Sequence, residues 1–298
     1  MGFEDRHPAV NLIFFTAVIA GTILFHHPGY LGISVVCALA YSIYRGGRRA
    51  AVFDLCVLVC AGVFCLYYST FHHFGITELG RNPVGNRVTL ESVVYGMVLG
   101  LTVAGVVMWM SCVYSVVSSD KVVYLFGRVS PRGALALSVL LRMVPRIKDR
   151  AKQLDRARQG VGRGACTGGF FPRVRNGICI FSMLLTWLIE TLPMMADAMR
   201  SRGSALRGRT AYSIYRFDNW DRAYIIAMFG ALTVTGMGVL LHQTNITYDP
   251  QIVMNPVTPM SWVFYAGYAL LCLMPMAQEI YSRARFRYDR DRAMGRLG

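Results

Sequence analysis

Long apolar runs, separated by short polar stretches, dominate the pattern of the chain. A helix needs roughly 20 mainly apolar residues to cross a bilayer, with some latitude. Six runs meet this requirement, and they cover residues 9–26, 30–44, 51–71, 92–117, 222–241 and 260–278. The tight turn "HHPG" separates the first two, which together predict a helical hairpin. The pattern therefore predicts an all-α membrane protein with about six transmembrane helices.

The composition supports this class. Of the 298 residues, 54% are hydrophobic and 16% are charged, and the mean hydropathy is +0.41. These values are typical of a chain that uses lipid as part of its solvent. The net charge is nevertheless +15, so the placement of the basic residues carries information.

One segment holds more than half of the basic residues. Residues 119–217 contain 18 of the 31 Lys and Arg, against five acids. We therefore divide the chain into three parts. Residues 1–118 carry four spans, residues 119–217 form a cytoplasmic coupling segment, and residues 218–298 carry two spans and a basic tail.

The loops predict the orientation in the membrane. "RGGRR" at 45–49 has three arginines and the tail 279–298 has six, whereas 72–89 has two and 242–258 has none. Because cytoplasmic loops carry an excess of Lys and Arg, the N-terminus, 45–49, the central segment and the tail are expected in the cytoplasm. We expect no cleavable signal peptide, since few basic residues precede the first run and no small-x-small site follows it.

The central segment predicts two long helices built on one plan, each with an apolar body, a proline, a basic amphipathic arm and a glycine stop. A short amphipathic helix in "SSDKVVYLFGRVSPRG" precedes them. Ser130 and Pro131 then provide a capping hydroxyl and a proline at the first helical position. The first long helix is expected to bend at Pro145, because a proline removes one backbone hydrogen bond. Beyond it, the faces divide into Ile147, Ala151, Leu154 and Arg158 on one side and Lys148, Lys152 and Arg156 on another.

The glycine-rich stretch "GVGRGACTGG" is interpreted as an elbow, and the second long helix is expected to start near Asn176. This helix has Pro193 at its bend, and its arm "MMADAMRSR" ends at Gly203, where a left-handed cap would terminate it. Arg200 and Arg202 lie in its last turn. Cations there suit the negative end of the helix dipole, which by itself is enough to explain them. The repetition of the plan favours an additional role.

The sequence offers no chemistry of its own. It has no nucleotide-binding motif, no catalytic-triad pattern and no paired carboxylates, and no His, Cys or acidic set has the spacing of metal ligands. The eight cysteines are expected to be small buried hydrophobes. Asp54, near the end of the third run, is expected to be neutralised by Arg48 or Arg49. We therefore predict a non-catalytic protein with neither cofactor nor metal, acting as a coupler between other components.

The central segment resembles a known family. "SDKVVYLFGRVSPRGALALSVLLRMVPR", a basic helix and "AMRSRG" are similar to the transmembrane T component of energy-coupling factor transporters, ABC-class importers of vitamins and metal ions. The resemblance covers about 119–222. It implies that two coupling helices each end in an Ala-Arg-Gly-type motif, whose arginine enters a groove on one of two ATPase subunits. It also implies a separate membrane S component, which captures the substrate. ATP-driven motion is expected to topple this S component in the membrane. ATP would be bound by the partner subunits.

The resemblance carries over to named residues. For the second motif, Ser201-Arg202-Gly203 matches the triplet, Ala198 and Arg200 precede it, and Arg202 is our first choice for the ATPase contact. The first motif is degenerate. Counting from Pro145 gives the arginine-free triplet 160–162, whereas residue type favours Ala157, Arg158 and the following glutamine. Arg158 or Arg163 could therefore serve.

The sequence leaves three alternatives to a coupling subunit. A stand-alone channel or carrier could bind anionic lipid with its basic segment, at about 1 kcal/mol per basic residue. An enzyme acting on anionic lipids would need interfacial acids or histidines, which the sequence does not supply. Nucleic-acid binding is least favoured, because the arginines are tethered at a bilayer and form no recognisable module. In the resembled family, another polypeptide selects the transported substrate.

Overall fold

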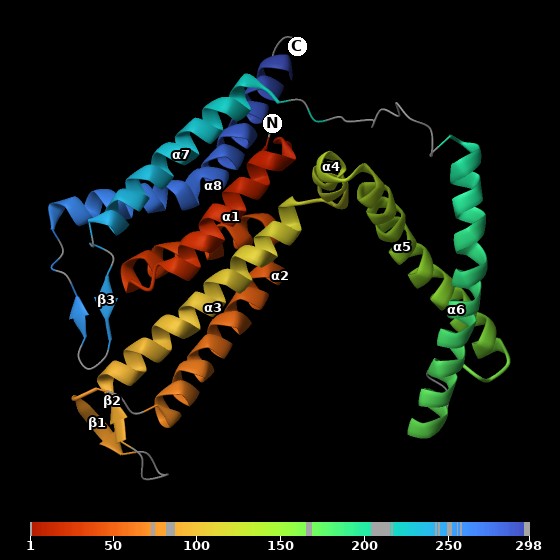
Figure 1. The fold of residues 1–298 in the computed structure, drawn as a ribbon, viewed down its shortest axis with the longest axis horizontal. Coiled ribbons are helices and arrows are strands. Elements are labelled where there is room, and N and C mark those ends of the chain that lie inside the picture. The colour runs from red at the N-terminus through yellow and green to blue at the C-terminus, as the bar shows by residue number, and fades with distance from the viewer. Residues whose placement is uncertain are drawn as a thin grey trace. The chain divides into compact units, whose positions relative to one another are not determined.

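The chain forms eight helices and four short strands among the residues that the computed structural model describes (Figure 1). The described residues are 2–72, 75–81, 87–164, 169–203, 215, 217–241, 243, 245–248, 252–254, 256 and 258–294. The chain divides into two compact units, which we describe separately. The membrane unit comprises Met1–Ser118 and Tyr215–Gly298, and the central unit comprises Ser119–Ile214.

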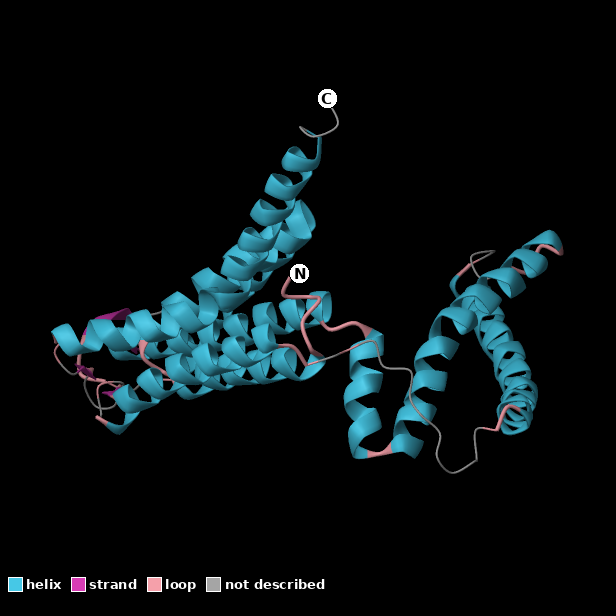
Figure 2. Cartoon of the chain, turned by 90° about the horizontal axis from the view of Figure 1, so that it is seen from above, coloured by secondary structure: helices cyan, strands magenta, loops and turns pink. Residues whose placement is uncertain are grey.

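Five helices build the membrane unit. They are α1 (Pro8–Leu24), α2 (Pro28–Phe71), α3 (Leu90–Val116), α7 (Asn219–Leu240) and α8 (Pro259–Met294). Helix α3 packs along α2 and α1, while α8 packs along α7 and α2. Two antiparallel hairpins, β1 (Glu78–Arg81) with β2 (Arg87–Thr89) and β3 (Ile246–Thr247) with β4 (Val253–Met254), add to the predicted all-α fold. Figure 2 shows the strands confined to one end of the helices of this unit.

The helix boundaries differ from the six predicted spans. By length and composition, five helices can cross a membrane: α2, α3, α7, α8 and α6 (Phe170–Ser201) of the central unit, whereas α1 has only 17 residues. The second and third predicted spans lie in the two helical arms of α2, which meet at Gly47, where the backbone is non-helical with φ +60° and ψ −144°. The predicted division of this stretch into two spans is confirmed, and the two arms are joined by a kink at Gly47 rather than by a loop over 45–49. A positive φ is readily adopted only by glycine, which explains why the break falls there.

Close approach between helices holds the membrane unit together. On α3, an added Cβ at Gly100 would lie 2.8 Å from the carbonyl oxygen of Ala61, and one at Gly96 would lie 3.2 Å from that of Cys65. Small residues of this kind let two helix backbones pack tightly where lipid gives no hydrophobic drive. The predicted burial of cysteines is correct for Cys37, Cys112 and Cys272, but Cys56 and Cys60 are exposed on α2. Their positions on the surface of a membrane helix require no protein neighbour.

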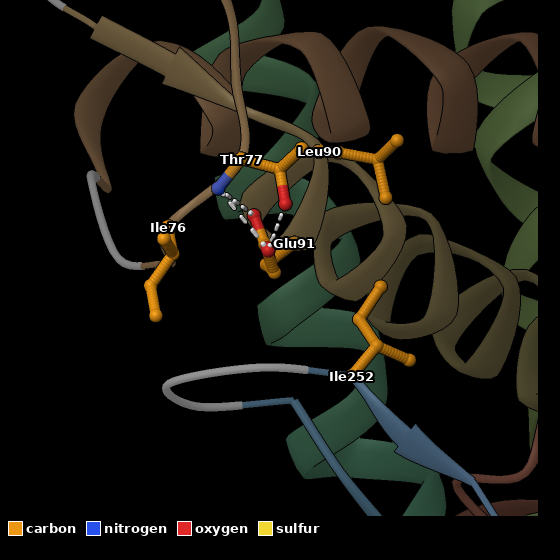
Figure 3. Close-up of a pocket in the computed structure, with 5 residues that line it drawn as sticks. All are labelled: Ile76, Thr77, Leu90, Glu91 and Ile252. Carbon is orange, nitrogen blue, oxygen red and sulfur yellow. Dashed lines mark hydrogen bonds between the residues drawn. The ribbon is translucent and has the colours of Figure 1, made fainter.

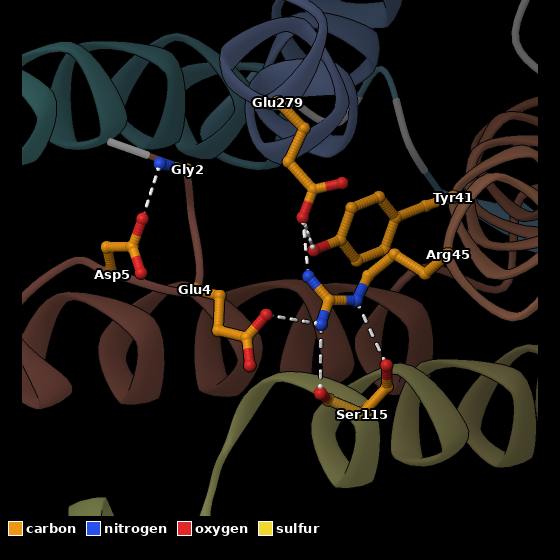
Figure 4. A network of polar contacts seen from close by, with 7 residues as sticks. All are labelled: Gly2, Glu4, Asp5, Tyr41, Arg45, Ser115 and Glu279. Carbon is orange, nitrogen blue, oxygen red and sulfur yellow. Dashed lines mark hydrogen bonds and ion pairs between the residues drawn. The ribbon is translucent and has the colours of Figure 1, made fainter. Parts of the chain in front are cut away.

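Arg45 ties four segments of the membrane unit together (Figure 4). Its guanidinium pairs with Glu279 on α8 and, at 2.8 Å, with Glu4 before α1. It also donates to the hydroxyl of Ser115 on α3 at 3.0 Å and to the carbonyl of the same residue at 3.1 Å. Tyr41 donates a further hydrogen bond to Glu279 at 3.5 Å. The charge of Arg45 is therefore neutralised inside the unit.

Asp54 does not follow the sequence prediction. Its residue is 1% exposed, and among the described residues it forms an ion pair with neither Arg48 nor Arg49, both of which are exposed. Side chains share a helix face at spacings of three and four residues, whereas these arginines precede Asp54 by six and five. The expectation that they neutralise this carboxyl is therefore wrong.

The central unit consists of α4 (Ser119–Val129), α5 (Pro131–Gly160) and α6 (Phe170–Ser201). The predicted start of α5 is confirmed, because the Ser130 hydroxyl accepts from the Gly133 amide at 3.3 Å and Pro131 occupies the first turn. Helix α6 begins six residues before the expected Asn176. Pro172 lies in its first turn, where the backbone amides have no partner within the helix and a proline costs nothing.

Candidate functional site

Three arginines of α5 contact α6 along the helix pair. Arg146 Nη1 lies 3.9 Å from Met195 Sδ, and the Arg150 guanidinium lies 5.8 Å from the ring centre of Trp187. Farther along α5, Arg158 Nη1 contacts Cys179 Sγ at 2.7 Å. The partners on α6 run from high to low residue numbers as α5 advances, so the two helices pair antiparallel.

Pro145 and Pro193, where the sequence predicts bends, lie at one level of this pair. Helices α5 and α6 continue through Pro145 and Pro193, respectively. Arg146 follows the first proline directly, and Met195, which it contacts, is two residues beyond the second. Each proline removes a backbone hydrogen bond at this level. Each helix therefore lacks a backbone hydrogen bond at the same level of the pair.

The amphipathic pattern predicted for the α5 arm is confirmed. Ile147, Ala151, Leu154 and Arg158 are all half-buried, whereas Lys148, Lys152 and Arg156 are all exposed. Since Arg158 contacts α6, the half-buried face is the one that packs within the helix pair. On α6, Met195, Ala196 and Met199 are half-buried as well, and Met195 contacts Arg146 of α5. Met195 therefore helps to hold the pair together.

The two helices end in the same backbone conformation. Helix α5 is followed by Val161 (φ −101°, ψ 10°) and by Gly162 with φ +72°. Helix α6 is followed by Arg202 (φ −82°, ψ 9°) and by Gly203 with φ +78°. In both cases the glycine amide donates at 2.9 Å to the carbonyl three residues earlier. The expected left-handed stop at Gly203 is present, and Val161 occupies the position equivalent to Arg202.

The residues of the second predicted motif lie together at the end of α6. Ser201 donates its hydroxyl hydrogen to the Ala198 carbonyl at 3.0 Å, which ties the last turn down. Arg200 lies 3.9 Å from Asp197, but both side chains are more than three-quarters exposed, so this ion pair is weak. Arg202 is exposed and forms no ion pair with any acid among the described residues. It is the cation most available to an outside partner at this end.

The candidates for the first motif separate in the structure. Arg158 turns inward: besides Cys179, it donates from Nε to the Arg163 carbonyl at 3.1 Å, and its Nη2 lies 3.5 Å from Asn176 Oδ1. The side chains of Ala157 and Arg163 are exposed. Sequence reasoning missed Asn176 and Cys179 as partners. No local spacing connects them with Arg158, since they lie across the elbow on the next helix.

A small open pocket in the membrane unit was considered as a second site (Figure 3). It is lined by Ile76, Thr77, Leu90, Glu91 and Ile252. The Glu91 carboxylate accepts from the Thr77 hydroxyl at 2.5 Å and from the Thr77 amide at 3.3 Å. Its acceptors therefore fasten the segment before β1 onto the start of α3. Glu91, the charged residue that lines this pocket, therefore stabilises the fold.

One comparison with known proteins agrees with the resemblance. No protein-family model matches the chain. Over 107 residues, the chain is 31% identical to the energy-coupling factor transporter transmembrane protein EcfT of Lactobacillus helveticus (strain DPC 4571). The chain resembles an energy-coupling factor membrane subunit. The match covers 34% of this chain and 38% of the relative, so it takes in little more than a third of either. With five helices long and apolar enough to span a bilayer, the chain has the features of a multi-pass membrane protein of this kind.

Proposed function

We propose that this protein is the non-catalytic coupling subunit of an ATP-driven importer of the energy-coupling factor type. The observation that carries the proposal is the end of α6, where an exposed Arg202 directly precedes the left-handed Gly203. In this proposal Arg202 enters a groove on one of two ATP-binding subunits. Those subunits bind and hydrolyse ATP, and the chain itself holds no cofactor.

The chemistry of arginine suits such a joint. Its guanidinium is charged at every physiological pH, and its planar fork can pair with a carboxylate through two hydrogen bonds. When one partner of a buried charge pair is removed, the other charge is stranded, which typically costs about 2–5 kcal/mol. A single arginine can therefore decide whether two subunits stay docked.

The pairing of α5 with α6 gives motion a route through the central unit. Arg146, Arg150 and Arg158 each bridge the two helices, so a push on one end displaces both. The methionines at the contact are adaptable, which lets the helices tilt against each other without losing packing. In this proposal the displacement reaches a substrate-binding membrane S component. The S component would select the vitamin or metal ion that is transported.

The proposal includes an orientation. In this proposal the N-terminus, the central unit and the C-terminal tail lie in the cytoplasm, where ATP-binding subunits are found, and α6 serves as a coupling helix although its length and composition would also allow it to span a bilayer. The arginines at 45–49 and in the tail support this assignment, because basic loops are retained on the cytoplasmic side. Two ATPase genes beside the gene for this chain would be an inexpensive indication of the same partners.

The direct test is Arg202→Glu, with Arg175→Glu as matched control. Arg175 is also exposed on α6 but lies in its first two turns, far from the end that carries Arg202. Arg202→Glu should abolish co-purification of the ATP-binding subunit docked at the α6 end of the full chain, because it places like charges in the groove. Arg175→Glu should leave it intact. Wild-type co-purification and uptake with Arg202→Glu would refute the proposal.

A second function is favoured by the exposed basic side of α5, which consists of Lys148, Lys152 and Arg156. A stand-alone channel or carrier could use this side to bind anionic lipid headgroups. Such a protein would transport solute after reconstitution alone, without ATP. Transport that requires ATP and co-purified ATP-binding subunits would exclude it.

A further inference from the structure

We infer that the two ends of the α5–α6 pair dock differently: the α5 end enters an apolar groove through Val161, and Arg158 positions that end from inside the central unit. The inference rests on the proposed function, because it concerns the partners of the same two ends. It departs from the sequence expectation that an arginine serves at both.

Arg158 is already committed within the chain. Its three nitrogens reach the Arg163 carbonyl, Asn176 Oδ1 and Cys179 Sγ, and Asn176 Nδ2 in turn donates to the Gly164 carbonyl at 3.0 Å. The backbone just beyond α5 is thus fastened by two side chains, one from each helix. Turning Arg158 outward into a partner would release this fastening. It is a positioning residue.

Val161 has the exposure and setting of a contact residue. Its side chain is 77% exposed, and it occupies the backbone position that Arg202 occupies on α6. The glycines on either side, Gly160 and Gly162, have nothing within 4 Å of an added Cβ. The isopropyl group therefore stands between two residues without side chains, so a groove wall can close around it. Apolar burial is the favourable interaction that such a group offers.

The charges around the two ends lead to different expectations. Arg163 is exposed two residues past Val161, which places its cation at the rim of any groove that holds the valine. Rim charges mainly affect association rate and salt dependence, whereas a charge inside a groove affects dissociation. At the α6 end, the charged residue Arg202 occupies the position that is equivalent to Val161. Accordingly, the α6 end fits a groove with carboxylates and the α5 end fits one with apolar walls.

Photo-crosslinking in the assembled complex tests the contact chemistry. The crosslinker p-benzoylphenylalanine is placed at Gln159 or Arg200 of the full chain, which are exposed and lie two residues before Val161 and Arg202, so that both contact side chains are kept. The cross-linked peptides are identified by mass spectrometry. We expect position 159 to capture apolar residues and position 200 to capture a segment containing Asp or Glu, both in ATP-binding subunits. Capture of equivalent acidic segments at both positions would overturn the inference while supporting the proposed function. Capture of no ATP-binding subunit at either would refute both.

Substitution at Val161 gives an independent measurement. Val161→Asp should weaken co-purification of the subunit bound at the α5 end by at least about tenfold, and Val161→Ile should preserve it. The wild-type contact should survive 1 M salt, at which the Debye length falls from about 8 to about 3 Å, whereas the Arg202 contact should weaken. Val161→Arg should also reduce binding. Stronger binding by Val161→Arg would show an acidic groove and contradict the inference.

The positioning role of Arg158 has its own test. If Arg158 acts through the elbow, Asn176→Ala should reduce cross-linking at position 159 as Arg158→Ala does, and the double substitution should add little. Arg158→Lys should not restore it fully, because one ammonium cannot reproduce the planar fork. If Arg158 instead contacts the partner directly, Asn176→Ala will leave cross-linking unchanged, and the inference is wrong.

Discussion

Arg45 in the membrane unit and Arg202 in the central unit represent two uses of the same side chain. Arg45 is largely buried and is matched by Glu279 and Glu4. Arg202 is exposed and meets no acid among the described residues. The charge of Arg45 is used to hold helices together, whereas the charge of Arg202 remains available to a partner. The difference identifies the end of α6, rather than the more heavily bonded Arg45 cluster, as the place to expect a partner.

The largest effect is expected from Arg45→Ala. Removing this guanidinium strands Glu279, whose side chain is 7% exposed, in a membrane protein core. Breaking a buried pair in this way costs about 3–5 kcal/mol in unfolding free energy. Thermal unfolding of the purified protein in detergent measures it. The double variant Arg45→Ala, Glu279→Gln should recover part of the loss, and an unchanged midpoint in the single variant would show that the cluster is not structural.

The converse result is expected for Arg202→Gln. Docking to an ATP-binding subunit should weaken by about 2–5 kcal/mol, while the unfolding midpoint stays at the wild-type value because no internal bond is lost. Binding is measured by titrating the purified subunit onto the full chain in nanodiscs. If the midpoint falls along with binding, the charge of Arg202 is used inside the protein and the comparison with Arg45 fails.

A smaller and equal effect is expected at the two helix stops. Gly162→Ala and Gly203→Ala should each destabilise the helix end by about 1–2 kcal/mol, because both glycines have a positive φ that a Cβ disfavours. Hydrogen exchange of the last turns of α5 and α6 measures this. Unequal effects would show that the common backbone conformation of the two ends is not a common structural requirement.

The smallest effect is expected from Arg285→Ala. Its contact with Asp289 on α8 is 4.0 Å long, and both side chains are about two-thirds exposed. Exposed pairs of this type contribute at most about 1 kcal/mol. The unfolding midpoint should be almost unchanged, which makes this variant the control for Arg45→Ala. A comparable loss in both variants would remove the distinction between buried and exposed arginines.

Local features of the fold could be predicted from the sequence because their causes are local. Ser130 followed by Pro131 gave the start of α5, and Gly203 gave the stop of α6. The start of α6 was missed because Pro172 was not recognised as a first-turn proline. The division of α2 into two helical arms was predicted from the polar stretch 45–49, but the length of the connection was not, since one residue with a positive φ is enough to interrupt the helix.

The contacts of the arginines could not be predicted, because their partners are distant in the chain. Glu279 is 234 residues from Arg45, and no periodicity relates them. For Arg158, helical spacing gave the correct face but not its use. The pattern did not show that this face meets the neighbouring helix, where Arg158 contacts Asn176 and Cys179.

The most direct test of the account is a charge exchange across the proposed joint. The carboxylate residue that cross-links to p-benzoylphenylalanine at position 200 is replaced by arginine in the ATP-binding subunit, and the variant is combined with Arg202→Glu in the full chain. We expect each single change to abolish co-purification of the subunit docked at the α6 end and ATP-driven uptake, and the combination to restore co-purification. Undiminished co-purification with either single change would contradict the claim that Arg202 is kept unpaired for a partner.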